Sequence, residues 1–310
     1  MSQTTSSHDT PTNANLHSIT LMIAAMGFFT LADLLIKIAS ETMPVGQVML
    51  VLGLGSTIVF LILMRMKKEP VLLAPLLQPA MLLRNSGDFI GSTSMCLALA
   101  YVPISTIGAV IQAVPLMLTA AGALFLGERV GIRRLSAIFV GFAGVLLILQ
   151  PGNTDFDAMV MLALLAAAGL TVRDIGTKLV SRKVSTLLVS LYGSMIFAIS
   201  GAILLSITGG AAWPDVTMIV MFLAMIGLGS VGYVCVTKAV RIGEMSVVSP
   251  FRYSRLLFSV MAGVLVLGER VDAMMLLGCA LTIGAGLYIW RREIILTPDA
   301  GASGTPQRGS

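Results

Sequence analysis

The sequence is poor in charged residues. Only 11% of its 310 residues are Asp, Glu, Lys or Arg, compared with roughly 25% in an ordinary soluble domain. Because a surface that faces water needs charged groups to cover it, this scarcity excludes a soluble enzyme. The net charge of +5 comes from short basic clusters between apolar runs, and these form no continuous basic face that could follow nucleic-acid phosphates. No nucleic-acid partner is therefore expected.

Histidine and cysteine are scarce as well. The only histidines, His8 and His17, lie before or at the start of the first apolar run, which excludes a histidine-based active site inside a membrane. Cys96, Cys235 and Cys279 lie within apolar runs and form no Cys-x-x-Cys pair, so we interpret them as packing residues, not as disulfides or metal ligands. A Gly-x-x-x-x-Gly-Lys-Ser/Thr loop is missing too, which excludes ATP as the direct fuel within this chain. We expect no catalytic residue, metal or cofactor.

Long apolar runs, by contrast, are abundant. Hydrophobic residues make up 56% of the chain, and they come in blocks of about 20, long enough for a helix to cross a ~30 Å hydrocarbon layer. Ten such spans are predicted, at 18–39, 45–64, 84–102, 104–126, 132–150, 158–180, 186–208, 216–240, 246–267 and 272–291. The chain is thus predicted to be an all-α integral membrane protein embedded in the lipid bilayer. Residues 1–17 and 297–310, rich in small and polar residues, are predicted to be disordered.

Lysine and arginine gather in every second connection between these spans. The basic connections and the segment after the last span contain Arg65, Lys67, Lys68, Arg133, Arg134, Arg182, Lys183, Arg241, Arg291 and Arg292. The intervening connections are uncharged or acidic, with Glu41, Asp155, Asp157, Asp215, Glu269 and Asp272, and contain only Arg270 as a base. By the positive-inside rule, both termini are predicted to be cytoplasmic.

The chain also contains an internal duplication. At an offset of 141 residues, 126–130 (Leu-Gly-Glu-Arg-Val) matches 267–271 without a gap. Intramembrane polar residues match at the same offset, since Thr30, Asp33, Lys37 and Ser40 fall on Thr171, Asp174, Lys178 and Ser181. Each repeat, 18–150 and 158–291, holds five spans, and because five is odd the second repeat enters the membrane upside down. Two inverted five-helix repeats predict a substrate site near the midplane and transport by alternating access.

These features carry a resemblance to a known family. The five-plus-five repeat, the Leu-Gly-Glu that ends a span in each copy, and the stretch Gly141-Phe142-Ala143-Gly144-Val145 resemble EamA-type members of the drug/metabolite transporter superfamily. The resemblance covers nearly all of residues 18–291 and implies a multi-pass protein of the bacterial inner membrane. It further implies a central cavity lined by spans 1, 3, 4, 6, 8 and 9, with spans 5 and 10 standing apart.

Two acid–base pairs lie in spans 1 and 6 at helical spacing. Asp33 and Lys37 are four residues apart, as are Asp174 and Lys178, so each pair shares a helix face. An ionised side chain at the bilayer centre costs ~3 kcal/mol even on insertion scales, so it needs a partner or a watery cavity. One interpretation is two in-helix ion pairs, and the other is that one Asp is a protonatable coupling site. Arg173, about 100° around the helix from Asp174, is a candidate substrate contact.

Span 9 holds the densest polar cluster near the midplane. It reads Arg252, Tyr253, Ser254 and Arg255, directly after Ser249-Pro250. Arg252 and Arg255 are three residues apart, so the face they share must point to water, to an acid or to an anionic group of the substrate. The two interpretations are a substrate contact and a structural pair with Asp88, Asp33 or Asp174.

Spans 3 and 8 add further candidates. Arg84 is predicted to reach the cytoplasmic edge of span 3, while Asp88, one turn deeper, either lines the cavity or pairs with an arginine of span 9. Tyr253 and Tyr233 either stack on a flat ring of the substrate or fill the core.

Prolines and glycines predict where helices break or approach closely. Gln112 precedes Pro115 by three residues, and a proline frees a backbone carbonyl one turn earlier, so this pair is predicted to form a site wall or a kink. Pro250 predicts a second break. Small residues that allow close backbone packing are predicted at Gly87 and Gly91, Gly141 and Gly144, Gly227, Gly229 and Gly232, and Gly284 and Gly286.

The favoured hypothesis is a secondary-active carrier of a small polar organic molecule, driven by a proton or a counter-solute. Buried arginines, tyrosines and a serine-rich third span suit a flat, hydrogen-bonding or partly anionic molecule, and riboflavin-type vitamin uptake is the narrower guess. An amino-acid or drug exporter is the alternative, and a pore, which would need a ring of repeated polar groups, is the alternative of another class. Direction of transport, coupling ion and oligomeric state, including a homodimer, stay open.

Overall fold

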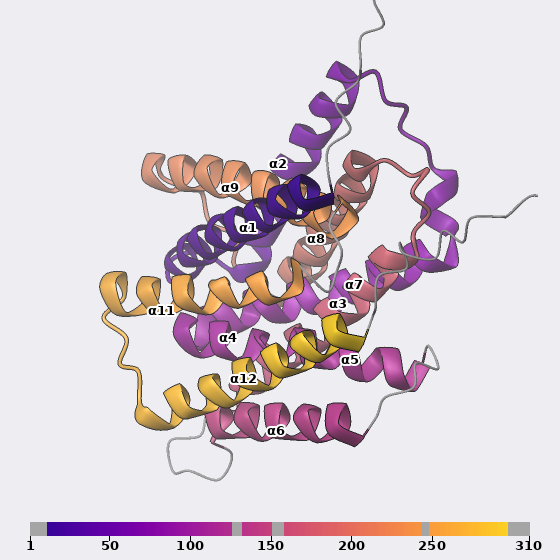
Figure 1. Ribbon diagram of the computed structural model, residues 1–310. Coiled ribbons are helices and arrows are strands. Elements are labelled where there is room, and N and C mark those ends of the chain that lie inside the picture. The colour runs from indigo at the N-terminus through magenta and orange to yellow at the C-terminus, as the bar shows by residue number, and fades with distance from the viewer. Residues whose placement is uncertain (1–10, 126–131, 151–157, 243–247, 297–310) are drawn as a thin grey trace, which may run out of the picture.

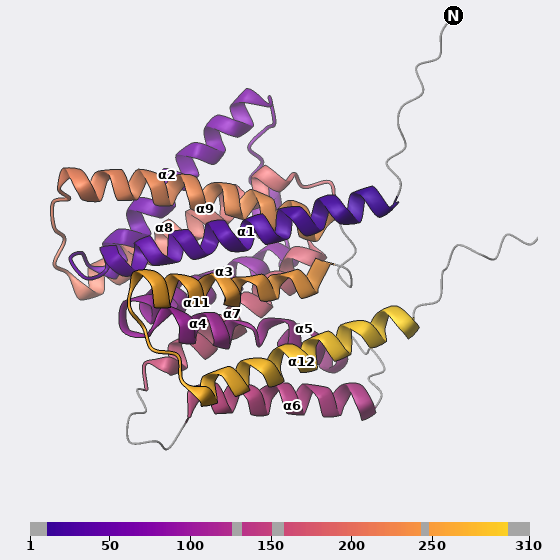
Figure 2. The same ribbon diagram turned by 60° about the vertical axis from the view of Figure 1, so that its left-hand side comes forward.

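The protein is a bundle of helices (Figures 1 and 2). The computed structural model describes residues 11–125, 132–150, 158–242 and 248–296. The α-helices are α1 (Pro11–Ala39), α2 (Val45–Met66), α3 (Pro79–Tyr101), α4 (Ile104–Ile111), α5 (Val114–Phe125), α6 (Ile132–Leu149), α7 (Val160–Leu179), α8 (Thr186–Thr208), α9 (Val216–Ile242), α11 (Ser254–Val266) and α12 (Ala273–Leu296). Two short 3-10 helices, η1 (Ala74–Leu77) and η2 (Ser249–Tyr253), complete the described part.

Seven helices are long and apolar enough to cross a membrane by length and composition, and α4 with α5 counts as one of them. The other three predicted spans are α3, which carries buried charges, the shorter α6, and η2 with α11. The predicted all-α membrane fold is thereby confirmed.

The N-terminal segment differs in part from its prediction. α1 begins at Pro11, so residues 11–17 are helical where disorder was predicted. A proline suits the first turn of a helix because its missing N–H would have no partner there. Residues 1–10 and 297–310, the rest of the predicted disorder, lie outside the described part of the chain.

The two repeats superimpose element by element at the offset of 141 residues. α2 and α8 begin at Val45 and Thr186, and α6 and α12 begin at Ile132 and Ala273. α3 and α9 end at Tyr101 and Ile242, again 141 residues apart. The agreement identifies the counterparts of the two repeats. They are α1 and α7, α2 and α8, α3 and α9, α4 with α5 and η2 with α11, and α6 and α12.

The helices pair across the repeats as a two-fold axis requires. α1 packs on α9 and α3 packs on α7, two contacts that the repeat exchange turns into each other. α2 packs on α8, α4 on α11, and α6 on α12, each helix against its own counterpart. Two hydrogen bonds join residues exactly one repeat offset apart, from Gln112 Nε2 to the Tyr253 carbonyl at 3.1 Å and from Thr282 Oγ1 to the Gly141 carbonyl at 3.2 Å. Such contacts between equivalent residues lie on the axis between the halves.

Glycines bring several of these helices into backbone contact. A side chain at Gly87 or Gly169 would overlap with the backbone of the facing helix in the α3–α7 crossing. Gly144 faces Gly278 in the same way between α6 and α12, so the predicted close packing is found at both places. The prediction is wrong for Gly227, Gly229 and Gly284, where a Cβ would meet no atom within 4 Å, because open space and not a facing backbone lies beside each of them.

Candidate substrate site

A cavity of about 200 Å³ lies between the two repeats. Its walls come from α1, α3, α4 with α5, α7, α9, and η2 with α11, the six spans that the family resemblance implied. α2 and α8 also contribute, through residues such as Phe60 and Phe197, which the resemblance did not include. Among the described residues α6 and α12 contribute none, and both views show these two helices side by side at the edge of the bundle (Figures 1 and 2).

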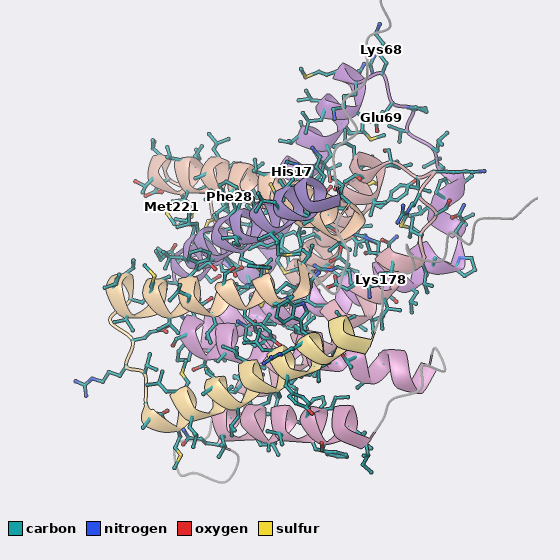
Figure 3. All side chains as sticks on the ribbon, in the orientation of Figure 1. His17, Phe28, Lys68, Glu69, Lys178 and Met221 are labelled. Carbon is teal, nitrogen blue, oxygen red and sulfur yellow. The ribbon has the colours of Figure 1, made fainter. Side chains whose placement is uncertain are left out.

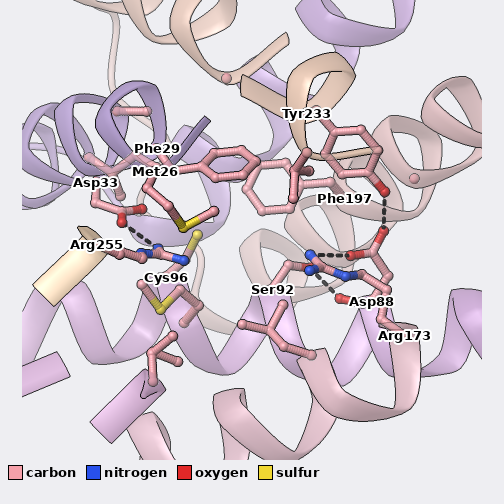
Figure 4. Close-up of a pocket in the computed structure, with 18 of the residues that line it drawn as sticks. Met26, Phe29, Asp33, Asp88, Ser92, Cys96, Arg173, Phe197, Tyr233 and Arg255 are labelled. Carbon is pink, nitrogen blue, oxygen red and sulfur yellow. Dashed lines mark hydrogen bonds and ion pairs between the residues drawn. The ribbon is translucent and has the colours of Figure 1, made fainter. Parts of the chain in front are cut away.

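The cavity wall is aromatic in part and carries several hydroxyl groups. Its rings are Phe29, Phe60, Phe197 and Tyr233, and its hydroxyl side chains include Ser56, Ser92, Ser194 and Ser230. The rings of Phe60 and Tyr233 lie 6.3 Å apart between centroids and are tilted by 58°. Figure 4 shows charged side chains at two opposite sides of this space, with Ser92 and Cys96 between them.

One side of the cavity carries a single ion pair. Arg255 Nη2 of α11 lies 2.5 Å from Asp33 Oδ2 of α1, and the guanidinium carbon stands 5.8 Å from the centre of the Phe29 ring. Both charged side chains line the cavity. The pair thus joins the first repeat to the second, with an aromatic ring beside the cation.

The opposite side carries three arginines and two aspartates. Arg84 Nη2 lies 3.2 Å from Asp88 Oδ2, and Arg173 Nη1 lies 3.8 Å from Asp88 Oδ1. Asp174 accepts from two arginines, Arg173 Nη2 at 2.9 Å and Arg252 Nη1 at 2.5 Å. Tyr233 Oη donates to Asp88 Oδ2 at 3.3 Å. We call these five charged residues the arginine cluster.

These pairs correct the predicted in-helix pairs. Asp33 contacts Arg255, not Lys37, and Asp174 contacts Arg173 and Arg252, not Lys178. Lys178 is exposed near the end of α7 (Figure 3). The physical reason is the length and shape of the arginine side chain. It extends to a carboxylate and presents a planar fork of donors, which lysine lacks.

One further prediction about an arginine needs correction. Arg84 is 1% exposed, so it does not reach the membrane edge; Asn85 Oδ1 at 2.7 Å and Asp88 hold its guanidinium inside. Arg173 lines the cavity, where it stays a candidate substrate contact, and it also bonds Asp174 with both Nε and Nη2. The i, i+4 spacing of Arg84 and Asp88 was the signal that could have identified the buried pair.

The repeats differ in how they carry these charges. Asp33 and Asp174 are repeat counterparts, yet both bond arginines of one segment, residues 252–255. The counterparts of Arg252 and Arg255 in the first repeat are Ile111 and Val114. The site is therefore charged asymmetrically within a symmetric framework.

Comparison with known proteins identifies the framework. The EamA-like transporter family matches the chain twice, over residues 16–150 and 157–291. The chain belongs to the EamA-like transporter family. It is a transporter of the drug/metabolite transporter superfamily, not an enzyme, and the two matched segments are its two repeats.

Three similarities describe its place among known proteins. The riboflavin transporter of Rhizobium johnstonii is 30% identical to this EamA-like transporter over 207 residues, which cover 66% of this chain and 68% of that protein. The S-adenosylmethionine uptake transporter of Rickettsia bellii is 28% identical over 212 residues, 67% of this chain and 71% of that protein. A solved crystal structure with 19% identity covers 88% of this chain and 96% of its own at a TM-score of 0.59, which is a likeness of fold.

The two broken spans of this EamA-like transporter meet at its axis. α4 ends at Ile111 and α5 begins at Val114, while η2, which contains Pro250, precedes α11. Gln112 lines the cavity and donates to the Tyr253 carbonyl. A side chain at Gly286 would overlap with the Tyr253 hydroxyl, so the Tyr253 ring packs toward α12 and is not among the residues that line the cavity. The prediction that Tyr253 contacts substrate is therefore corrected, because the 3-10 turn directs its side chain away.

Sequence reasoning missed two caps at the corner between α3 and α4. Lys37 Nζ donates to the carbonyls of Leu99 at 3.1 Å and Val102 at 2.8 Å, where α3 ends. The Glu269 carboxylate accepts from the Ile104 N–H at 2.7 Å, the Ser105 N–H at 3.0 Å and the Ser105 hydroxyl at 2.6 Å. Helix ends carry unpaired donors and acceptors that need partners away from water. A cation at a helix C-terminus and an anion at an N-terminus also suit the helix dipole.

Both caps lie at one end of the bundle, which we call the acidic end and define by Glu41, Asp215, Glu269 and Asp272. Other bonds join the repeats there. Gln47 Nε2 donates to the Ala212 carbonyl at 2.6 Å, and Gln150 Nε2 donates to Asp272 Oδ2 at 2.7 Å. The acidic end is thus held together by several polar contacts between α1–α6 and α8–α12.

Replacing Glu269 by Gln is expected to loosen this end. An amide offers a single acceptor oxygen, so at least one bond to the start of α4 is lost, at a cost of about 1–3 kcal/mol. Hydrogen exchange at the Ile104 and Ser105 amides should become faster. The control is Asp215→Asn, which changes an acid to an amide at another helix cap, where Asp215 Oδ1 accepts from Met218 N at 2.7 Å, and should leave those amides unchanged. Unchanged exchange in Glu269→Gln would contradict the assignment of the cap.

Proposed function

We propose that this transporter is a secondary-active carrier that moves a small, flat, polar metabolite by alternating access, with riboflavin-type uptake as the specific activity. The observation that carries the proposal is the cavity between the repeats, which combines aromatic walls with charged groups at two opposite sides. Ligand sites of this kind use apolar and aromatic surface for affinity and a few polar groups for orientation.

The aromatic walls favour a ring system as the transported molecule. Phe29, Phe60, Phe197 and Tyr233 line the cavity, and aromatic side chains gain from stacking or edge contacts with a flat ring. Serine hydroxyls and the Gln112 side chain supply hydrogen-bonding groups for a polar ring edge or a polyol chain. A riboflavin transporter is among its relatives, at 30% identity, and agrees with this chemistry.

Alternating access is supported by a difference between two repeat counterparts. Lys37 is docked on the carbonyls that end α3, whereas Lys178 is exposed; one of the two counterpart carbonyls, at residue 243, lies outside the described part of the chain. In a carrier built from inverted repeats, a state that is closed at one end and open at the other requires the two repeats to differ in conformation. If the repeats exchanged their conformations, the closed end would open and the open end would close. A pore open to both sides has no need of this asymmetry.

The ion coupling is proposed to use Asp33. Its carboxylate has one arginine partner, while Asp174 has two. Protonation of Asp33 would break one ion pair, whereas protonation of Asp174 would break two, so Asp33 is the better candidate for proton coupling, with counter-solute exchange as the alternative.

Uptake of riboflavin by proteoliposomes tests the carrier. We expect flux that saturates with concentration and stops when the imposed gradient is removed. Flux that rises linearly without saturation would identify a pore. Outward flux of an amino acid with no riboflavin flux would favour the exporter.

The protein is proposed to lie in a bacterial inner membrane with both termini in the cytoplasm. In a background with the native cysteines replaced, a cysteine at Trp213, which is 99% exposed, is expected to react with an impermeant maleimide in intact cells, whereas a cysteine at Lys68 should react only after the membrane is opened. Labelling of both positions from one side would contradict this topology and the inversion of the repeats.

A further inference from the structure

The arginine cluster has one more cation than anion. Arg84, Arg173 and Arg252 face only Asp88 and Asp174 within the described part of the chain. These groups are well removed from solvent, with Arg84 1% and Arg252 8% exposed. By comparison, Arg255 and Asp33 balance each other on the opposite side. A buried guanidinium without a matching anion is costly, because burial removes its hydration and nothing replaces it.

Arg252 has two unsatisfied buried donors, whereas Arg84 and Arg255 have one each, their Nε. The Nη1 of Arg252 binds Asp174, while its Nε and Nη2 are buried and have no hydrogen-bond partner. Nε and Nη2 form one edge of the guanidinium, the edge that binds the two oxygens of a carboxylate or phosphate side by side. The edge that carries a bidentate donor pair is therefore without a partner on a side chain that is 10% exposed.

Arg252 borders two cavities. Arg252 lines the central cavity and also a second cavity of about 20 Å³, whose wall includes Arg84, Arg173 and Thr237. That volume is enough for roughly one water-sized group. It matches one oxygen or a small terminal group, and the rest of a larger molecule would extend into the central cavity.

We propose that Arg252 forms an oxyanion subsite that takes a carboxylate or phosphate monoester group. The anion completes the charge balance of the arginine cluster and occupies the free edge of Arg252. The first repeat has Ile111 at the equivalent position, so it offers no second arginine for such a subsite. This inference rests on the proposed carrier function. The anion is either an acidic group of the transported molecule or a small free anion that binds together with that molecule.

The test uses purified full-length protein and its melting temperature. Sodium acetate is compared with acetamide, a neutral molecule of the same shape, in a constant background of sodium HEPES. We expect acetate to raise the melting temperature by about 2–5 °C at saturation, while acetamide changes it by less than about 1 °C. Arg252→Gln should abolish the acetate effect. Arg65→Gln, the same change at an exposed arginine outside the cavity, should preserve it.

A second measurement separates the two sources of the anion. Riboflavin 5′-phosphate and riboflavin share one ring and differ by a phosphate. If the transported molecule carries the acid, the phosphate ester stabilises the protein more than riboflavin does, and acetate competes with it. If a free anion occupies the subsite, the effects of riboflavin and acetate add.

Equal effects of acetate and acetamide on the wild-type protein would overturn the inference, and this comparison holds even if Arg252→Gln does not fold. Saturable riboflavin uptake would then still support the carrier. An acetate effect that Arg252→Gln removes, together with no riboflavin binding or uptake, would support the subsite and reject riboflavin as the substrate.

Discussion

Neutralising Asp33 alone, as in Asp33→Asn, is expected to reduce uptake at least about tenfold and to lower the amount of protein in the membrane, because breaking a buried pair costs ~3–5 kcal/mol. The loss arises at Arg255, whose guanidinium would stay buried beside the Phe29 ring without its carboxylate. Arg255→Gln is expected to lower the amount of protein for the reciprocal reason. Transport assays and immunoblots of the same membranes measure the two effects.

The double change Asp33→Asn with Arg255→Gln separates stability from transport. Removing both charges leaves no unpaired ion, so the amount of protein should recover while uptake stays low. Full recovery of uptake would make the pair structural and would remove Asp33 from the coupling mechanism.

Lys37 provides the matched control for this double change. It lies four residues from Asp33 on the same helix but binds the carbonyls of Leu99 and Val102. Adding Lys37→Gln to Asp33→Asn should therefore add a second loss. If this combination restored the protein and the Arg255 combination did not, the partner assigned to Asp33 would be wrong.

A single methyl group at Gly169 is expected to have the second large effect. A Cβ there would overlap with the backbone of Gly91 on α3, and backbone cannot move aside as a flexible side chain can. Gly169→Ala should therefore push α3 and α7 apart, which displaces Asp88 and Arg173 and abolishes uptake. Overpacking of this kind costs ~1–3 kcal/mol or more, and the melting temperature should fall together with the uptake rate.

Gly227→Ala is the control for a glycine within a helix. It lies in the apolar helix α9, but a Cβ there meets no atom within 4 Å. Uptake should stay close to wild type, and stability should be unchanged or higher, since alanine favours a helix over glycine by up to ~1 kcal/mol. Equal damage from both changes would mean that helix contact at Gly169 is not the cause.

Much of the fold could be predicted because its signals are local or repeated. Apolar runs of membrane-crossing length mark the spans, and the matches of Asp33 with Asp174 and Lys37 with Lys178 reveal the duplication. Helix boundaries in the two repeats then agree at the same offset, as at Ile132 and Ala273. Five spans per repeat require the inversion by counting alone.

The candidate site could be predicted only in part. Hydropathy and spacing identified most of the charged residues that line the cavity, since a charge in an apolar run is conspicuous. The same reasoning placed Arg84 at the membrane edge, which was wrong, and it left open whether Tyr253 contacts substrate or fills the core. Helical spacing describes the face of one helix and carries no information about which neighbouring helix supplies a partner.

Composition and the internal repeat were thus enough to determine a membrane transporter of two inverted halves, because hydrophobicity and chain order are properties of the sequence itself. Only the tertiary structure decided that Asp33 binds Arg255, that Asp174 is shared by Arg173 and Arg252, and that Glu269 caps α4. The physical reason is that the partner of a long charged side chain depends on the distance between the packed helices and on how completely these helices exclude water. That distance depends on close contacts such as Gly91 against Gly169, which form only when the two halves meet.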